Sequence, residues 1–242
     1  MNILLIGRGR MGRLIEQTAA AAGDTVVAAV GREALHSLDT MGTVADVVMD
    51  FSSPAALSAV AAYVRRTGTP LLSGTTGYTP EQLRLFDQLG QYAPVLYSAN
   101  FSVGIAVFRR VLEQISDVLR PDFDIEIVET HHNQKADAPS GTAKLLLEAI
   151  DPRHELTPVY GREGLCGRRR KNEVGVHALR GGTMAGQHTV HFFGPDEVLE
   201  ITHTATSRQI FVNGALHMAR KLQKFPRGNY DLQEILFGGN AL

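Results

Sequence analysis

The sequence predicts an α/β protein with two domains, one built on a parallel sheet and one of α+β type with a mixed or antiparallel sheet. A glycine-rich turn joins the first apolar strand to a helix, and strand-length apolar runs then alternate with helical patterns as far as residue 102. After residue 103, strands with alternating polar and apolar residues dominate. The 242 residues are enough for two modest domains. We therefore assign residues 1–102 and 209–242 to the first domain and residues 103–208 to the second.

The first strand and its turn predict a nucleotide site. Asn2–Ile6 is apolar, and a helical pattern and a second strand, Thr25–Val30, follow the turn. The turn itself consists of Gly7, Arg8, Gly9, Arg10, Met11 and Gly12. In this context the first glycine makes the tight turn, the second lets a pyrophosphate approach the backbone, and the third lets helix pack on strand. A Rossmann-like dinucleotide-binding domain is therefore expected, with a glycine-rich turn in another kind of α/β protein as the alternative.

The end of the second strand bears on the choice of cofactor. An NAD-specific site usually places an acidic residue here to bind the ribose 2′-hydroxyl, but this chain has Gly31 and Arg32. The Arg32 guanidinium can pair with a 2′-phosphate, which favours NADPH. The neighbouring Glu33 counts against this, so NADH stays possible.

Strands and helices continue to alternate through the rest of the first domain. The expected elements are a strand over Val44–Phe51, a helix from Pro54 to Val64, a strand over Pro70–Ser73, a helix over Glu81–Leu89 and a strand over Val95–Tyr97. The loops after the last two strands lie where open parallel sheets bind ligands, so we expect them to hold the nicotinamide half of the cofactor. Their residues are Gly74, Thr75, Thr76, Ser98, Ala99, Asn100 and Phe101. An ordinary turn and, for the phenylalanine, a core position are the alternatives.

A helix after Val103 leads to the stretch that carries most of the groups able to move protons, residues 126–143. The stretch begins as a strand and then becomes polar. Within it lie His131, His132 and Lys135, and an imidazole exchanges protons near neutral pH. The alternative is a pair of surface histidines. No cysteine or further histidine stands at metal-ligand spacing, so no metal is expected.

The end of the same stretch predicts an anion site. Ser140 is a good N-cap for a helix, so the amides of Gly141 and Thr142 lie at its positive end, where a carboxylate or phosphate binds favourably. An ordinary helix cap is the alternative.

The second domain continues with strands over Val174–Leu179, Gln187–Phe193 and Val198–Thr204, which alternate like an antiparallel sheet with one covered face. Association with other subunits would cover the rest. Helices over Phe211–Leu222 and Leu232–Phe237 are expected to rejoin the first domain. At the crossing between domains, Arg208 could clamp a carboxylate or could be a solvated side chain.

Composition limits the partners and the compartment. Lys and Arg total 24 against 25 Asp and Glu, so a nucleic-acid partner is not expected. The longest apolar stretches fall short of the roughly 20 residues that a membrane span needs. A single cysteine and the lack of a secretory leader suggest the cytoplasm. The basic run at residues 168–171 is either a solvated loop or a surface for an anion.

The motifs together resemble the 4-hydroxy-tetrahydrodipicolinate (dihydrodipicolinate) reductase family of lysine biosynthesis, nearly from end to end. They are GRGRMG after the first strand, GTTG and SANFSVG after later strands, and the run E-I-x-E-x-H-H-x-x-K-x-D-A-P-S-G-T-A. The last is highly specific, whereas the glycine loop alone is not. The resemblance implies a Rossmann-like domain, a substrate-binding α+β domain that builds a homotetramer, and the use of NADPH or NADH.

The resemblance also implies roles for residues. His131 would be the acid/base residue and Lys135 the proton donor. His132, the Ser140-Gly141-Thr142 turn and Arg208 would bind the substrate's carboxylates, and residues 7–12, 74–76 and 98–101 the cofactor. The chain departs from the family pattern in a glycine loop one residue shorter than in many members and in Gly31, where many carry an acid.

The implied substrate is a cyclic imine with two carboxylates, which needs both a hydride and a proton. Two other functions are compatible with the fold. An amino-acid or sugar dehydrogenase would share the glycine loop and the two-domain plan but would not need the histidine–lysine run. A nucleotide sensor or scaffold would need neither His131 nor Lys135.

Overall fold

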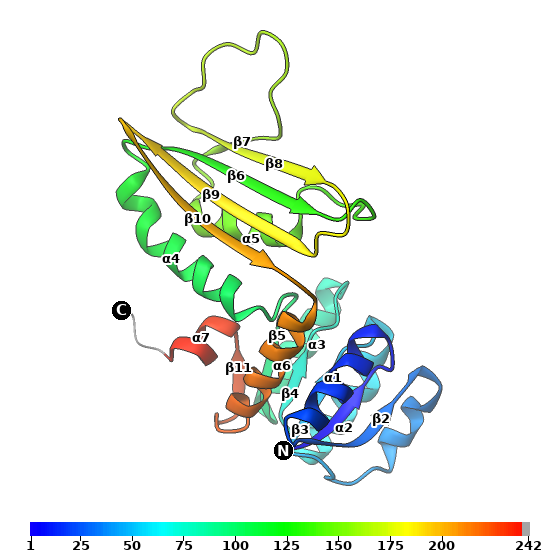
Figure 1. The fold of residues 1–242 in the computed structure, drawn as a ribbon. Helices are drawn as coiled ribbons and strands as arrows, with labels where there is room; N and C mark the ends of the chain where they lie inside the picture. Colours follow the sequence, from blue (N-terminus) through cyan, green and yellow to red (C-terminus); the bar gives the residue numbers. More distant parts are fainter. Residues whose placement is uncertain (239–242) are drawn as a thin grey trace. The chain divides into compact units, whose positions relative to one another are not determined.

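The computed structural model describes residues 1–238, so the last four residues of the range 209–242 lie outside the described residues. The chain divides into two compact units. Unit 1 comprises Met1–Ser102 and Gln209–Leu242, and unit 2 comprises Val103–Arg208. Figure 1 shows a separate sheet in each unit.

Unit 1 contains a six-stranded parallel sheet in the order β11-β5-β4-β3-β1-β2. Its strands are β1 (Asn2–Ile6), β2 (Thr25–Val30), β3 (Val47–Asp50), β4 (Leu71–Ser73), β5 (Pro94–Tyr97) and β11 (Gly228–Tyr230). The predicted Rossmann-like sheet is confirmed. Strand β3 starts at Val47, later than the predicted Val44, because Val44 is exposed and Asp46 holds the backbone amide of Asn2.

Helices and short 3-10 turns alternate with the strands of this sheet. They are α1 (Arg10–Ala21), α2 (Leu57–Thr67), α3 (Pro80–Gln88), α6 (Gln209–Leu222) and α7 (Leu232–Phe237), with short 3-10 turns η1 (Arg32–Asp39), η2 (Pro54–Ala56) and η3 (Leu89–Gln91). Helix α2 is followed by its C-cap Gly68, whose φ of 68° suits glycine. Helix α6 contacts β4 and β5. On α6, Val212, Ala215, Leu216 and Ala219 form a buried apolar stripe.

Unit 2 contains a five-stranded mixed sheet in the order β10-β9-β6-β8-β7. Its elements are α4 (Val103–Leu119), β6 (Asp124–His131), α5 (Gly141–Ile150), β7 (Thr157–Val159), β8 (Glu173–Arg180), β9 (Gly186–Gly194) and β10 (Glu197–Ala205). Strand β6 pairs antiparallel with β9 but parallel with β8, so the strands that looked antiparallel from their alternation form a mixed sheet. Helices α4 and α5 pack on one face of it through a shared apolar core (Figure 1). No helix in residues 1–238 has the length and apolar character needed to cross a membrane.

Strand β6 extends further than its apolar residues suggested. Ile125 and Ile127 face the core, and Glu129 continues the same face with no exposed side-chain surface. His131, expected in a loop, is the last residue of the strand. The register of the sheet therefore determines which residues lie beside His131.

Within the basic run at residues 168–171, Arg169 makes several contacts with the sheet of unit 2. The Arg169 guanidinium binds the carboxylates of Asp124 and Glu126 and the backbone carbonyls of Ile125 and Glu173. This side chain therefore ties the loop between β7 and β8 to the strands.

Candidate active site

The glycine turn of unit 1 has the close contacts that its sequence requires. Gly7 has a φ of 103°, and a Cβ atom there would collide with the carbonyl oxygen of Phe51. A Cβ atom on Gly12 would collide with the carbonyl oxygen of Gly7, whereas Gly9 faces open space. The first and third glycines therefore pack the turn, and the second leaves its backbone accessible.

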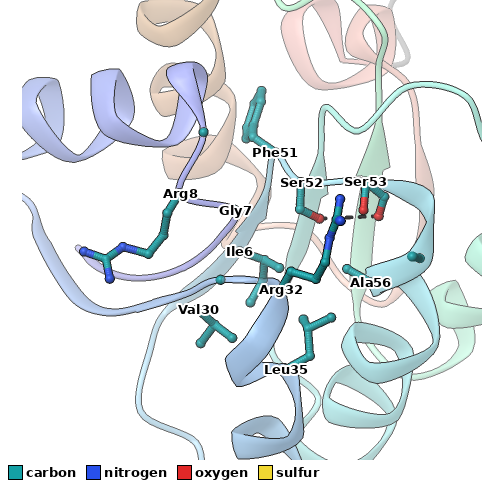
Figure 2. Close-up of a pocket in the computed structure, with 13 residues that line it drawn as sticks. Ile6, Gly7, Arg8, Val30, Arg32, Leu35, Phe51, Ser52, Ser53 and Ala56 are labelled. Carbon is teal, nitrogen blue, oxygen red and sulfur yellow. Dashed lines mark hydrogen bonds between the residues drawn. The ribbon is translucent and has the colours of Figure 1, made fainter.

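A hollow of about 180 Å³ lies beside this turn, at the carboxyl ends of β1, β2 and β3. It is lined by Ile6, Gly7, Arg8, Gly9, Val30, Gly31, Arg32, Leu35, Phe51, Ser52, Ser53, Ala55 and Ala56. Figure 2 shows the Arg32 side chain directed at Ser52 and Ser53, while that of Arg8 points away from them. Four of the predicted cofactor residues thus lie around one hollow. Of the others in the glycine turn, Arg10, Met11 and Gly12 form the first turn of α1.

The hollow suits a nucleotide. Helix α1 has no side-chain cap and no acidic residue in its first turn, so its amino end is open to an anion. The lining combines apolar side chains, among them Leu35 and Val30, with the guanidinium groups of Arg8 and Arg32. An apolar wall for a base and cations for phosphates are what a dinucleotide requires.

The other two predicted cofactor loops lie at the ends of β4 and β5. Gly74 is half-buried, and a Cβ atom there would collide with the Phe51 ring, while Thr75 is buried and Thr76 is exposed. Their position follows the carboxyl edge of the sheet, as predicted.

The segment after β5 is shaped by its own polar groups. The Ser98 hydroxyl donates to the Asn100 carbonyl oxygen at 2.7 Å, and Ala99 is exposed. Phe101 is 2% exposed and its ring lies 5.8 Å from that of Phe51. Phe101 therefore takes the core position that was the alternative to a cofactor contact.

In unit 2 the buried carboxylate of Glu129 is the centre of a polar cluster. It accepts two hydrogen bonds from Arg180, at 2.8 and 2.9 Å, one from the Ser140 amide at 3.0 Å, and one from His131 Nδ1 at 2.5 Å. Burial raises the pKa of Glu129, but the bonds from Arg180, His131 and Ser140 outweigh burial and hold the pKa below its ordinary value. Glu129 is therefore ionised at neutral pH.

The hydrogen bond to Glu129 determines which nitrogen of the His131 imidazole can exchange a proton. An ionised carboxylate only accepts hydrogen bonds, so Nδ1 of His131 carries a proton and Nε2 is the nitrogen that gains or loses one. A Cβ atom on Gly186, the first residue of β9, would lie 3.0 Å from Nε2. Glycine at this position keeps the reactive edge of the imidazole uncrowded.

A second imidazole supports the helix cap. His188 faces Glu129 across the β6–β9 pair, and its Nε2 lies 2.9 Å from the Ser140 hydroxyl. The Ser140 hydroxyl also accepts the Ala143 amide, which confirms Ser140 as the N-cap of α5. The rings of His188 and His131 meet edge to face at 5.1 Å. Burial lowers the pKa of His188 to about 4, so this imidazole is neutral at neutral pH.

Lys135 joins this cluster indirectly. Its ammonium lies 2.8 Å from an Asp137 carboxylate oxygen, and the Asp137 carbonyl oxygen accepts a hydrogen bond from Arg180. His131, Glu129, Arg180, Asp137 and Lys135 therefore form one continuous chain of polar contacts.

The remaining predicted substrate residues lie at three places. His132 is half-buried next to His131, and its carbonyl oxygen accepts the Lys135 amide. Gly141 and Thr142 begin α5 directly after Ser140. Arg208 is exposed and lies between β10 and α6. Its predicted role as a clamp stays a prediction.

Sequence reasoning missed three members of the cluster that lie on strands: Glu129, Arg180 and His188. Glu129 did carry a signal, because it occupies the core-facing register that Ile125 and Ile127 begin, and a buried carboxylate needs partners. The other two come from β8 and β9, and only the strand pairing brings them to Glu129.

Comparison with known proteins identifies relatives along almost the whole chain. Residues 1–101 match the family model "Dihydrodipicolinate reductase, N-terminus", and residues 104–236 match "Dihydrodipicolinate reductase, C-terminus". A 4-hydroxy-tetrahydrodipicolinate reductase of an Exiguobacterium species is 42% identical over 238 residues, covering 97% of this chain and 95% of the relative. That of Clostridium tetani is 41% identical over 248 residues, covering 98% and 97%.

Solved structures share the fold. The dipicolinate-bound dihydrodipicolinate reductase of Paenisporosarcina sp. TG-14 has a TM-score of 0.74 at 22% identity, covering 98% of this chain and 99% of that one. The DAP dehydrogenase of C. glutamicum has a TM-score of 0.56 at 14% identity, covering 99% and 96%. The architecture is thus common to dehydrogenases with different named substrates, and the fold alone does not select among them.

Proposed function

The chain belongs to the dihydrodipicolinate reductase family, and we propose that it reduces 4-hydroxy-tetrahydrodipicolinate to tetrahydrodipicolinate, in the diaminopimelate route to lysine, through the polar cluster around Glu129. The enzyme is an oxidoreductase that uses a nicotinamide cofactor. Unit 1 binds the cofactor, and unit 2 binds the substrate and supplies the protons.

NADPH is the preferred form of the cofactor. Gly31 brings no carboxylate to the ribose site, and Arg32 lines the same hollow as Gly7 and Gly9. Arg32 would pair with the 2′-phosphate, and the open amino end of α1 would hold the pyrophosphate. When bound, the nicotinamide ring supplies the hydride for the reduction.

His131 handles the proton that accompanies the hydride. Glu129 holds the imidazole through Nδ1, so Nε2 donates the proton and recovers it from solvent afterwards. Lys135 is the second proton-carrying group, and its bond to Asp137 holds the ammonium in place until a substrate carboxylate competes for it. A group that acts on the proton alone should change turnover without changing cofactor affinity.

The substrate is a dianion, and unit 2 offers groups that bind carboxylates. The Ser140-Gly141-Thr142 turn starts α5, where the helix dipole favours negative charge. His132, Lys135 and Arg208 would supply cations or donors to the two carboxylates. These contacts would hold the ring in position for reduction and balance the charge that develops on it.

The contact of buried Glu129 with His131 is the observation that carries this assignment. An imidazole fixed by an ionised carboxylate, beside a capped helix N-terminus, is an arrangement for proton transfer to an anionic ligand. The test mixes the protein with NADPH and enzymatically generated substrate and follows absorbance at 340 nm. We expect a loss of absorbance that depends on the substrate. Constant absorbance with this substrate, but a rise in absorbance when NADP+ is mixed with an amino acid or a sugar, would instead identify another dehydrogenase, and cofactor binding without any turnover would indicate a sensor.

The assembly we propose is a homotetramer built through unit 2. Its sheet has α4 and α5 on one face, and large apolar side chains such as Leu179, Phe193 and Val198 are exposed on its strands. Association of subunits would bury them.

A further inference from the structure

A buried carboxylate lies beneath the cofactor loops of unit 1 and has no part in the chemistry described above. Asp50, the last residue of β3, is 1% exposed. Its Oδ1 accepts the Ser52 amide at 3.1 Å and the Ser52 hydroxyl at 2.5 Å. Its Oδ2 accepts the Tyr78 hydroxyl at 3.1 Å and the Ser73 hydroxyl at 3.4 Å. All of these partners are neutral donors, and no ion pair to Asp50 forms within residues 1–238.

An acidic residue at this position is costly for the fold. The preceding strand residues Val47, Val48 and Met49 are fully buried, so an apolar residue would continue the core without desolvating a charge. Burial raises the pKa of Asp50, while the bonds from Ser52 and Tyr78 oppose this rise. A buried charge that no cation balances points to a purpose in the loops it contacts.

Those loops are the two that follow β3 and β4. The Ser52 amide also reaches the Thr75 hydroxyl at 2.9 Å, and the Thr75 amide reaches the Ser73 hydroxyl at 3.3 Å. Ser52 lines the nucleotide hollow, so the carboxylate is one bond away from it. The network therefore joins the hollow to the loop at residues 74–76 by two routes, directly from the Ser52 amide to the Thr75 hydroxyl and through the Asp50 carboxylate and the Ser73 hydroxyl.

Tyr78 connects this network to β5, the strand next to β4 in the sheet. Its hydroxyl lies 3.0 Å from that of Ser73, and its ring packs on Phe86 and Tyr97 at 6.4 and 5.5 Å. Tyr97 ends β5, directly before the loop at residues 98–101. Three consecutive strand ends are thus linked through the contacts of Asp50 and Tyr78.

We propose that Asp50 is a positioning residue that holds the loops after β3 and β4 in the arrangement that binds the nicotinamide cofactor. The inference rests on the proposed function, because that function supplies the cofactor. Asp50 acts through Ser52 and Thr75, whose backbone and hydroxyl groups it orients.

The test measures binding of NADPH to three variants of the full chain by the change in cofactor fluorescence. Asp50→Asn keeps the size of the side chain but replaces one acceptor oxygen with a donor, opposite the Tyr78 and Ser73 hydroxyls. Tyr78→Phe removes one donor and keeps the aromatic packing. Asp46→Asn is the matched control, because this exposed carboxylate also accepts a backbone amide, from Asn2, at the opposite end of β3.

We expect Asp50→Asn to raise the Kd for NADPH about tenfold, which is ~1.4 kcal/mol, and Tyr78→Phe to raise it about threefold. The KM for the dicarboxylate substrate and the kcat at saturating NADPH should stay within about twofold, and Asp46→Asn should leave all constants within about twofold. If Asp50→Asn does not fold, Tyr78→Phe alone decides.

A purely structural role gives a different result. Variants that melt at lower temperature but bind NADPH with the parent's Kd would overturn the proposal, as would an equal rise in the KM values for cofactor and substrate. The NADPH titration needs no substrate, so it is separate from the proposed function. A parent that binds NADPH but does not turn over the dicarboxylate refutes that function and leaves the Asp50 test valid.

Discussion

Replacement of Glu129 by glutamine tests whether the buried carboxylate drives the chemistry of His131. Glutamine has nearly the same shape and can still accept the Ser140 amide, but it carries no charge. The imidazole of His131 then loses its charged hydrogen-bond partner, and Arg180 loses its bidentate partner. The substitution therefore removes electrostatics while it largely preserves packing.

The size of the effect follows from the contacts. A hydrogen bond to a charged group contributes roughly 1.5–3 kcal/mol. If the bond between Glu129 and His131 contributes this much to the transition state, kcat falls roughly 10- to 150-fold, because 1.36 kcal/mol corresponds to a factor of ten. The Kd for NADPH should not change, since Glu129 belongs to unit 2 and the nucleotide hollow to unit 1.

Steady-state kinetics at 340 nm and NADPH titration provide the two readouts. The matched control is Glu126→Gln, the same substitution on the same strand but at a position of the opposite face, where the carboxylate binds Arg162, Arg169 and His177. Its kcat should stay within about twofold of the parent's. A Glu129→Gln variant that keeps the parent's kcat, or that loses no more than the control, would refute the reasoning.

Three further predictions concern the cofactor, pH and assembly. Arg32→Ala should weaken NADPH binding by roughly 1.5–3 kcal/mol and leave NADH binding unchanged, whereas Arg84→Ala on the exposed side of α3 should change neither; an unchanged ratio of the two dissociation constants would make Arg32 a mere surface residue. Burial lowers the pKa of His188 to about 4. An unfolded imidazole has a pKa near 6.5, so above about pH 6.5 the contribution of His188 to the free energy of unfolding is complete. As the pH falls from about 6.5 towards 4, the unfolded chain binds a proton that the folded His188 does not, and the free energy of unfolding falls by about 3 kcal/mol, at 1.36 kcal/mol per pH unit. Urea unfolding across that range should show a flatter pH dependence for His188→Gln, and parallel curves would contradict this. Light scattering at micromolar concentration should give a mass about four times the 26.3 kDa of one chain, and a value near 26.3 kDa would exclude the tetramer.

Much of unit 1 could be predicted because its signals are local. The glycine turn between β1 and α1 combines glycine chemistry with an apolar strand before it and a helical pattern after it. The predicted bounds of β1, β2 and α7 agree with the structure. Strand β11, by contrast, was not predicted, since Gly228–Tyr230 contains no apolar run and is a strand only because it pairs with β5. The same holds for short β7, which pairs with β8.

The candidate site shows the same limit. His131, Lys135 and Ser140 lie close together in the sequence and could be selected from it, and the capping role of Ser140 is confirmed. The partners that give these residues their chemistry lie far along the chain, because Arg180 is 51 residues from Glu129 and His188 is 48 residues from Ser140. Such contacts depend on strand register, which the sequence pattern alone did not determine.

The central claim is that His131 supplies the proton for a reduction whose cofactor binds elsewhere in the chain. It is tested most directly by comparing the parent and His131→Gln for kcat with NADPH and enzymatically generated substrate, alongside the Kd for NADPH. General acid–base catalysis contributes about 10²–10⁴ in rate, so we expect kcat to fall at least about 100-fold while the Kd stays within about twofold. A variant with near-parental kcat and an unchanged pH profile would contradict the account and would move the proton to Lys135 or to a bound water.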